Sequence, residues 1–254
     1  AVAAAGARDY SMPEERSTGS TVPLNLLLDI DGTLAITDRL YLLAFQDLMR
    51  PFGYTDVDEA WFEKHVAGKV DVEVFRALMP ADSTAEMLEA TSRKKDALFV
   101  QKAASEGAAI VPGLREVLQM ARRCGWRCIA VTNAQRGGGQ AVLDMLRREL
   151  GDEVAGVIED LVVGCECERA KPHPEPYLEG IRRLGAAAEH CIVFEDSSTG
   201  VRAGVAAKVA AVVGIRTSLT DDVLCAAGAT ATVADWSELS EARLRELVAT
   251  SSSA

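Results

Sequence analysis

Short apolar runs alternate with stretches of helical spacing along the chain from residue 114 onward. Apolar runs bounded by turn residues predict strands, and apolar residues that recur every three or four positions predict helices. The expected strands are residues 127–131, 161–163, 191–194, 209–213 and 231–233, and the expected helices are residues 114–124, 140–150, 175–184 and 199–207. This alternation is typical of right-handed βαβ units, so it predicts a parallel sheet with helices on both faces.

An earlier apolar run, residues 24–28, ends at Asp29 and is expected to be a strand of the same sheet. Residues 38–108 instead show helical spacing and almost no strand candidates, so a helical segment interrupts the sheet. We therefore predict an α/β protein with a Rossmann-like core and an inserted small helical cap. The expected bounds are residues 23–36 and 110–250 for the core and 37–109 for the cap.

The first 22 residues are rich in Ala, Ser and Gly and lack the apolar stretch of a secretory signal. Residues 1–22 are expected to be a flexible tail, and a remnant of an organelle-targeting segment is the open alternative. The six cysteines are scattered and do not resemble a disulfide framework. We expect a reducing compartment, cytoplasm or plastid, and no secretion. Cys165-Glu166-Cys167 lacks the spacing of a zinc knuckle, and a redox role there is left open.

Charge restricts the partners of this chain. Its 254 residues include 27 basic and 38 acidic ones, a formal charge of −11. An acidic chain repels a phosphate backbone, so nucleic-acid binding is not expected. No stretch approaches the ~18 unbroken apolar residues of a membrane span, so we expect no membrane partner. A negatively charged ligand would need a local cation to overcome this field.

Polar side chains follow four of the predicted strands. In chain order they are Asp29 and Asp31, Thr132 and Asn133, Lys171 after a short loop, and Glu195 and Asp196. Each alone has an ordinary explanation, as a turn, a helix N-cap, a surface lysine or first-turn acids. Ligands of open parallel sheets bind at the carboxyl ends of the strands, so the joint placement predicts one functional site.

Four carboxylates at one edge of a sheet need cations. Two like charges ~4 Å apart repel by ~4 kcal/mol at an effective dielectric constant of ~20. Oxygen ligands without His or Cys favour Mg²⁺, which completes its shell with water and substrate phosphate. Lys171 would supply a second, fixed positive charge. The set therefore suits a dianionic phosphate ligand.

Four segments resemble the motifs of the haloacid dehalogenase superfamily of phosphohydrolases, in the family's order and near its spacing. They are Asp29-Ile-Asp31-Gly-Thr33, Thr132-Asn133, Lys171-Pro-His-Pro and Glu195-Asp196-Ser-Ser-Thr-Gly200. The helical insertion resembles the small cap of the β-phosphoglucomutase-like branch. Within that branch, the segments that begin at Val131, Cys165 and Glu195 look most like plant-type sugar phosphatases. The resemblance covers roughly residues 24–245.

The resemblance implies roles for the acidic residues. Asp29 would be the nucleophile that forms an aspartyl phosphate, and Asp31 the general acid and then the base. Mg²⁺ would be held by the Asp29 carboxylate, the backbone carbonyl of Asp31 and Asp196, with Glu195 acting directly or through water. 

The resemblance also implies phosphate contacts. Thr132 and Asn133 would hydrogen-bond phosphate oxygens, and Lys171 would neutralise charge on the nucleophile and the transferring group. In the cap, Gly68-Lys69 resembles a substrate-contacting loop, which would place Lys69 over the phosphate or a sugar hydroxyl.

The expected function is Mg²⁺-dependent hydrolysis of small phosphomonoesters, sugar or polyol phosphates, by a monomer. A phosphosugar mutase is the alternative, but the mutases of this branch carry a histidine where this chain has Tyr41. A receiver-like signalling domain would use a similar acidic pair, Thr and Lys, but such domains are about half this length and have no helical cap. A true dehalogenase needs neither Asp31 nor the metal acids, and an inactive binding protein is expected to have lost a motif residue.

Overall fold

The computed structural model describes residues 22–66, 69 and 71–251, and a six-stranded parallel sheet forms the centre of that part. The strands are β1 (Asn25–Leu28), β4 (Arg127–Thr132), β5 (Ile158–Val163), β6 (Cys191–Glu195), β7 (Ala211–Ile215) and β8 (Ala231–Val233). Their order is β5-β4-β1-β6-β7-β8, and every neighbouring pair is parallel. The predicted parallel α/β fold is confirmed. The expected tail at residues 1–22 lies outside the described residues, apart from Val22.

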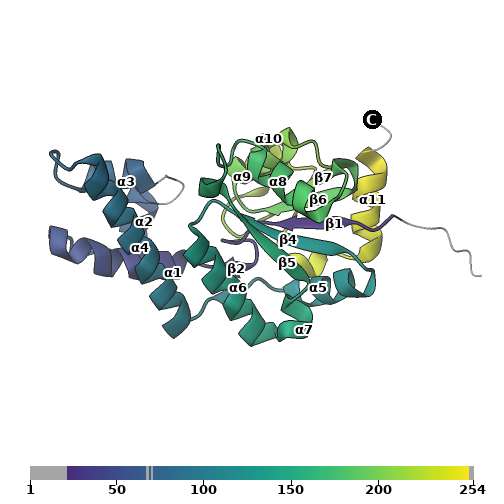
Figure 1. Ribbon diagram of the computed structural model, residues 1–254, viewed down its shortest axis with the longest axis horizontal. Helices are drawn as coiled ribbons and strands as arrows, with labels where there is room; N and C mark the ends of the chain where they lie inside the picture. Colours follow the sequence, from purple (N-terminus) through teal and green to yellow (C-terminus); the bar gives the residue numbers. More distant parts are fainter. Residues whose placement is uncertain (1–21, 67–68, 70, 252–254) are drawn as a thin grey trace, which may run out of the picture.

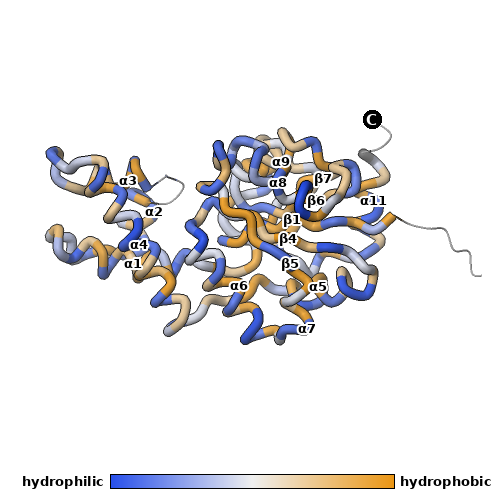
Figure 2. Tube along the Cα trace, in the orientation of Figure 1, coloured by the Kyte–Doolittle hydropathy of each residue, from blue (hydrophilic) through white to orange (hydrophobic). Residues whose placement is uncertain are grey.

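Helices cover both faces of this sheet (Figure 1). One face carries α5 (Leu114–Arg123), α6 (Arg136–Leu150), α7 (Asp152–Ala155) and α11 (Glu241–Ser251), and the other carries α8 (Glu175–Leu184), α9 (Ser198–Ala206) and α10 (Asp221–Ala227). Side chains alternate along a strand, so Leu26 and Leu28 enter one apolar cluster and Leu27 enters the other. Figure 2 shows the apolar residues concentrated along the strands.

The chain reverses its direction across the sheet beside β1. From β1 it moves outward to β4 and β5, then crosses back to β6 on the other side of β1 and continues to β7 and β8. Open α/β sheets bind ligands at the carboxyl ends of the strands where such a reversal occurs. In this sheet that position lies after β1 and β6, where Asp29 and Asp196 follow.

A separate helical group lies beside the sheet, at the left of Figure 1. It consists of α1 (Asp38–Met49), the 3₁₀ turn η1 (Arg50–Phe52), α2 (Glu59–His65), α3 (Asp71–Leu78) and α4 (Ala85–Ser105). The chain enters and leaves it through the antiparallel pair β2 (Ala35–Ile36) and β3 (Ala109–Ile110). The sequence did not predict this pair, because two-residue strands carry no readable periodicity. The remaining 3₁₀ turns are η2 (Gly164–Glu166), η3 (Ala188–His190) and η4 (Trp236–Glu238).

Helices α1 and α4 belong to two apolar clusters at once. Phe45 of α1 packs with the other helices of the cap, whereas Leu40 packs with the sheet cluster. Helix α4 likewise places Leu88 in the cap cluster and Phe99 and Ala103 in the sheet cluster. The helical segment therefore packs against the sheet domain through apolar residues of α1 and α4, its first and last helices.

The glycine-rich segment before residue 140 is helical, whereas the sequence predicted a helix that starts only at residue 140. Helix α6 begins at Arg136 and includes Gly137, Gly138 and Gly139. A Cβ at Gly139 would lie 3.2 Å from both Leu161 Cδ2 and Thr132 Cγ2, so glycine at this position permits close packing of the helix on the sheet. Glycine lowers helix propensity, and here tertiary packing outweighs that preference.

Candidate active site

Lys171 lies among the polar groups at the carboxyl end of the sheet. Its Nζ donates to Asp29 Oδ1 at 2.7 Å, to Glu195 Oε1 at 2.7 Å and to the Val131 carbonyl at 2.8 Å. The residue is only 6% exposed. Burial by itself would lower the pKa of the Lys171 ammonium, but the carboxylates of Asp29 and Glu195 outweigh burial and raise it. Lys171 is therefore a fixed positive charge between carboxylates from two strands.

The carboxylate of Glu195 is held by four donors. Oε1 accepts hydrogen bonds from Lys171 and, at 2.7 Å, from the hydroxyl of Tyr177, while Oε2 accepts from the backbone N–H and the hydroxyl of Ser197 at 3.2 and 2.9 Å. Burial and the charge of Glu195 raise the pKa of the Tyr177 phenol well above its ordinary value, so the hydroxyl remains a donor. Helices α8 and α9 thus fix the direction of Glu195.

Asp29, Glu195 and Asp196 form a buried acidic group. One oxygen from each lies within 4.8 Å of the others. Burial and the charge of Glu195 raise the pKa of Asp29 well above its ordinary range, although Lys171 opposes this shift. Burial and Glu195 also raise the pKa of Asp196 to about 8. The structure brings together these three predicted residues, and their all-oxygen donor set fits Mg²⁺.

Asp31 lies beside this group and has a separate partner. Its Oδ1 accepts a hydrogen bond from the Thr37 hydroxyl at 2.7 Å. Burial raises the pKa of Asp31, and the bond from Thr37 opposes burial without cancelling it. A carboxyl group with a raised pKa retains its proton closer to neutral pH, which suits a group that must donate one.

The cap contributes a paired lysine and an aromatic side chain near Asp31. Lys95 of α4 donates to both carboxylate oxygens of Asp71, at 2.7 and 2.8 Å, and its Nζ lies 5.6 Å from the ring centroid of Tyr41. Tyr41 packs against Phe99 with ring centroids 4.4 Å apart. Burial raises the pKa of the Tyr41 phenol well above its ordinary value, so Tyr41 stays uncharged near neutral pH.

The side chain of Asn133 holds the backbone of Lys171. Its Oδ1 accepts from the Lys171 N–H at 3.1 Å, and its Nδ2 donates to the Lys171 carbonyl at 3.0 Å. Thr132 Oγ1 accepts from the backbone N–H of Ala134 at 2.9 Å. The predicted phosphate contacts of Thr132 and Asn133 remain predictions, and in this structure Asn133 holds the loop that carries Lys171.

Of the two predicted cap residues, only Lys69 lies in the described part of the chain. Lys69 is exposed between α2 and α3, and its Nζ donates to the Lys64 carbonyl at 2.7 Å. Gly68 lies outside the described residues. The predicted contact between this loop and the substrate stays a prediction.

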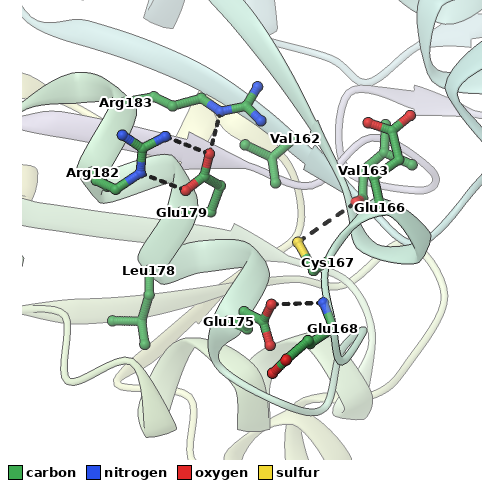
Figure 3. A pocket seen from close by; sticks show the side chains of 10 residues that line it. All are labelled: Val162, Val163, Glu166, Cys167, Glu168, Glu175, Leu178, Glu179, Arg182 and Arg183. Atoms are coloured by element: carbon green, nitrogen blue, oxygen red, sulfur yellow. Dashed lines mark hydrogen bonds and ion pairs between the residues drawn. The ribbon is translucent and has the colours of Figure 1, made fainter.

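A cavity of about 390 Å³ lies outside the acidic group, between β5, η2 and α8 (Figure 3). Among the residues that line it, Glu179 accepts hydrogen bonds from both Arg182 and Arg183. Glu175 accepts from the backbone N–H groups of Glu168 and Arg169, at 2.7 and 3.2 Å, and so braces the loop that leads to Lys171. None of the predicted site residues lines this cavity.

The cysteines give no sign of a redox pair. All six are free, and burial raises the pKa of the Cys165 and Cys167 thiols. A raised pKa disfavours the reactive thiolate form.

This arrangement has counterparts among known proteins. Residues 25–208, more than half of the chain, match the profile of the haloacid dehalogenase-like hydrolases. The chain belongs to this family. Among the described residues, the hydrolase has no helix that is both long enough and apolar enough to cross a membrane.

Curated relatives and solved structures agree with this assignment. The "Phosphorylated carbohydrates phosphatase" of Thermotoga maritima is 28% identical over 209 residues, which are 82% of this hydrolase and 93% of the relative. "Protein CbbY" of Rhodobacter capsulatus is 28% identical over 200 residues, which are 77% of this hydrolase and 84% of the relative. The β-phosphoglucomutase structure from Clostridium difficile has a TM-score of 0.71 at 19% identity. The match covers 90% of this hydrolase and 98% of the other chain. These similarities confirm the predicted family branch and the predicted class of enzyme, a phosphatase of this family.

Several residues of the site were not predicted from the sequence. Tyr177 lies in a segment that carried the family resemblance, six residues after Lys171, and a buried tyrosine beside a motif lysine is a signal that could have been used. Thr37 likewise lies close to Asp31 in the chain. Ser218 and Thr217 had no such signal, because they follow the first motif by more than 180 residues.

Removing divalent cations is expected to make the stability of this hydrolase fall as pH rises. The folded protein keeps a proton on Asp196 up to about pH 8, whereas an unfolded chain releases it near the ordinary value of 3.8. The folded state therefore binds more protons between these values, and the free energy of unfolding decreases across that window. Added Mg²⁺ should restore stability more strongly at the upper end of the window than at the lower end. Thermal melts with EDTA and with Mg²⁺ across this range measure both slopes, and parallel curves would contradict the expectation.

Proposed function

We propose that this chain is a Mg²⁺-dependent phosphatase that hydrolyses small phosphomonoesters, sugar or polyol phosphates, through an aspartyl phosphate on Asp29. One observation carries the proposal: a buried ammonium, Lys171, is bonded to a buried carboxylate, Asp29, that also faces two further acids. An ion pair of this kind, placed at the carboxyl end of a parallel sheet, combines a nucleophile with charge neutralisation for a phosphoryl group.

The proposed first step transfers the phosphoryl group to the protein. A carboxylate oxygen of Asp29 attacks phosphorus in line, and the bond from phosphorus to the leaving oxygen breaks. Lys171, already bonded to Asp29, offsets negative charge on the nucleophile and the transferring group. Asp31, with its raised pKa, gives its proton to the leaving oxygen.

The proposed second step returns the protein to its starting state. Asp31, now a carboxylate, takes a proton from a water molecule that attacks the aspartyl phosphate, and phosphate leaves with the carboxylate of Asp29 regenerated. The hydrogen bond from Thr37 holds Asp31 for both proton transfers.

The proposed Mg²⁺ ligands are the carboxylates of Asp29 and Asp196 and the backbone carbonyl of Asp31. Glu195 would act on the ion directly or through water. When bound, this ion would offset the charge of the phosphate and of the acids. Glu195 has four donors from the protein, which supports a role in aiming Lys171. Asp196 supports the metal role better, since Ser218 is the hydrogen-bond partner of its carboxylate within the described residues.

The proposed substrate class is a small phosphorylated metabolite. The helical cap beside the site is typical of enzymes that close over small substrates. The name of the Thermotoga maritima relative, which covers nearly its full length, supports phosphorylated carbohydrates. A monomeric state and a location in the cytoplasm or plastid remain predictions from the sequence.

A phosphosugar mutase is the second candidate, favoured by the similarity of fold to the Clostridium difficile β-phosphoglucomutase. A mutase must protect its aspartyl phosphate from water until a second sugar arrives. The sequence resemblance assigns Tyr41 to the position of the mutase histidine, and this difference supports hydrolysis. In the structure Tyr41 packs on Phe99.

The deciding experiment is a hydrolysis screen over phosphorylated metabolites with Mg²⁺, with parallel assays of isomer interconversion in the presence and absence of a sugar bisphosphate. We expect release of free phosphate from sugar or polyol phosphates, its loss in EDTA and its recovery when Mg²⁺ is added back. Interconversion that depends on the bisphosphate would establish the mutase instead. Full activity in EDTA would contradict the proposed metal site.

Asp31→Asn is expected to slow poor leaving groups much more than good ones. A sugar alkoxide must be protonated as it leaves, whereas an aryl oxide such as p-nitrophenolate needs little help, and general acid catalysis contributes about 10²–10⁴-fold. Measuring kcat/KM for a sugar phosphate and for p-nitrophenyl phosphate in wild type and variant gives the two ratios. Equal losses on both substrates would contradict the acid role, and Asp56→Asn, an exposed cap residue, is the control.

A further inference from the structure

The loop between β7 and α10 brings two hydroxyl groups to the acidic group. Thr217 Oγ1 donates to the carbonyl of Gly32 at 2.6 Å. The hydroxyl of the next residue, Ser218, donates to Asp196 Oδ2. One loop thus contacts both the turn that follows Asp31 and the acid that follows β6.

Gly32 shows how closely these groups pack. Its φ is +74°, a conformation that favours glycine. A Cβ at this position would collide with the carboxylate of Asp196 and lie 2.9 Å from the Ser218 hydroxyl. The backbone of Gly32, the Asp196 carboxylate and the Ser218 hydroxyl are therefore in mutual contact, and no side chain fits between them.

Both ends of the loop are anchored in the sheet domain. Ile215, the last residue of β7, is fully buried, and the N–H of Arg216 donates to the Val233 carbonyl at 2.9 Å. On the far side, Leu224 of α10 is fully buried in the apolar cluster beneath α8 and α9. Groups carried on rigid flanks hold their partners more accurately than groups on a free loop.

We propose that Ser218 and Thr217 are positioning residues of the divalent-cation site. Ser218 fixes the carboxylate of Asp196 by occupying Oδ2, and Oδ1 has no hydrogen-bond partner among the described residues. Thr217 fixes the Asp31–Gly32 turn. The loop therefore sets the relative position of two of the proposed metal-holding groups before an ion binds. This inference rests on the metal requirement of the proposed function.

The test measures Mg²⁺ binding to the full chain by isothermal titration calorimetry, without substrate. Loss of a hydrogen bond to a ligating group weakens metal binding by about tenfold or more, so Ser218→Ala should raise the Kd for Mg²⁺ by about tenfold. Ser218→Thr keeps a hydroxyl group and should stay close to wild type. Thr217→Val should weaken binding as well, and saturating Mg²⁺ should restore most of kcat in each variant.

Thr220→Ala is the matched control, because Thr220 lies in the same loop, is exposed and makes no side-chain capping bond at α10. Its Kd for Mg²⁺ should equal that of wild type. Melting temperatures in EDTA check that each variant is folded. An unchanged Kd in Ser218→Ala, a loss in Ser218→Thr as large as in Ser218→Ala, or absence of Mg²⁺ binding in wild type would overturn the inference.

The two proposals fail in different ways. A wild-type protein that binds Mg²⁺ through Ser218 but releases no phosphate from any substrate of the screen overturns the proposed function and leaves the positioning role intact. An active phosphatase whose Mg²⁺ affinity does not depend on Ser218 overturns the positioning role alone.

Discussion

Asp29→Asn is expected to abolish phosphatase activity. An amide is a far poorer nucleophile than a carboxylate, so no acyl phosphate can form at this position. Losing the nucleophile of a covalent enzyme reduces kcat by about 10⁴-fold or more, so the residual rate should lie near the background. The measurement is phosphate release at saturating Mg²⁺ for the best substrate of the screen.

The same substitution should not unfold the protein. Asparagine has nearly the shape of aspartate, and it removes a carboxyl group whose pKa is raised by burial and by the charge of Glu195, while Lys171 keeps its ion pair with Glu195. The melting temperature in EDTA should therefore be equal to that of wild type or higher. Mass spectrometry of acid-quenched wild type should find phosphate on Asp29, and the variant should carry none. Substantial turnover by the folded variant would contradict the assignment of the nucleophile.

Among the substitutions proposed for the site, Lys171→Met is expected to lower the free energy of unfolding the most. The ammonium neutralises Asp29 and Glu195, and its removal leaves both carboxylates buried without their cation. Removing one partner of a buried ion pair costs about 3–5 kcal/mol of unfolding free energy. Urea unfolding in EDTA measures this quantity directly.

Two further variants test whether the loss of stability comes from the unpaired buried carboxylates. Lys94→Met, on the exposed side of α4, makes the same chemical change and should alter the unfolding free energy by no more than about 0.5 kcal/mol. The double variant Lys171→Met with Glu195→Gln removes one unpaired charge and should recover part of the loss. A Lys171→Met protein as stable as wild type would show that these carboxylates do not depend on Lys171.

Much of the fold was predictable because hydrophobic period is a local property. The runs at residues 127–131 and 191–194 became β4 and β6 with shifts of one residue, since buried parallel strands are nearly continuous in apolar character. The errors occurred where local pattern and tertiary packing disagree. Gly139 precedes the predicted start of its helix at residue 140 and is helical, and a Cβ there would lie tightly against Leu161 and Thr132 of the sheet.

The helical insertion could be predicted from the change to helical spacing of apolar residues after residue 38. The way it packs against the sheet could not be predicted. Phe99 and Leu88 lie on one helix and both look like apolar helix positions. Only the three-dimensional arrangement shows that Phe99 packs with the sheet and Leu88 with the cap. A one-dimensional pattern tells which face of a helix is apolar and does not tell which neighbour covers it.

The order of strands and polar residues along the chain was enough to predict which side chains gather at one edge of the sheet, because a residue directly after a strand must lie at that edge. The hydrogen bonds between these side chains and their partners could be known only from the folded arrangement. Asn133 holds Lys171, and Thr217 reaches Gly32 across 185 positions of the chain. A hydrogen bond requires its two atoms within about 3 Å of each other at a suitable angle. For residues so far apart in the chain, that condition is met by the packing of the whole domain and leaves no periodic trace in the sequence.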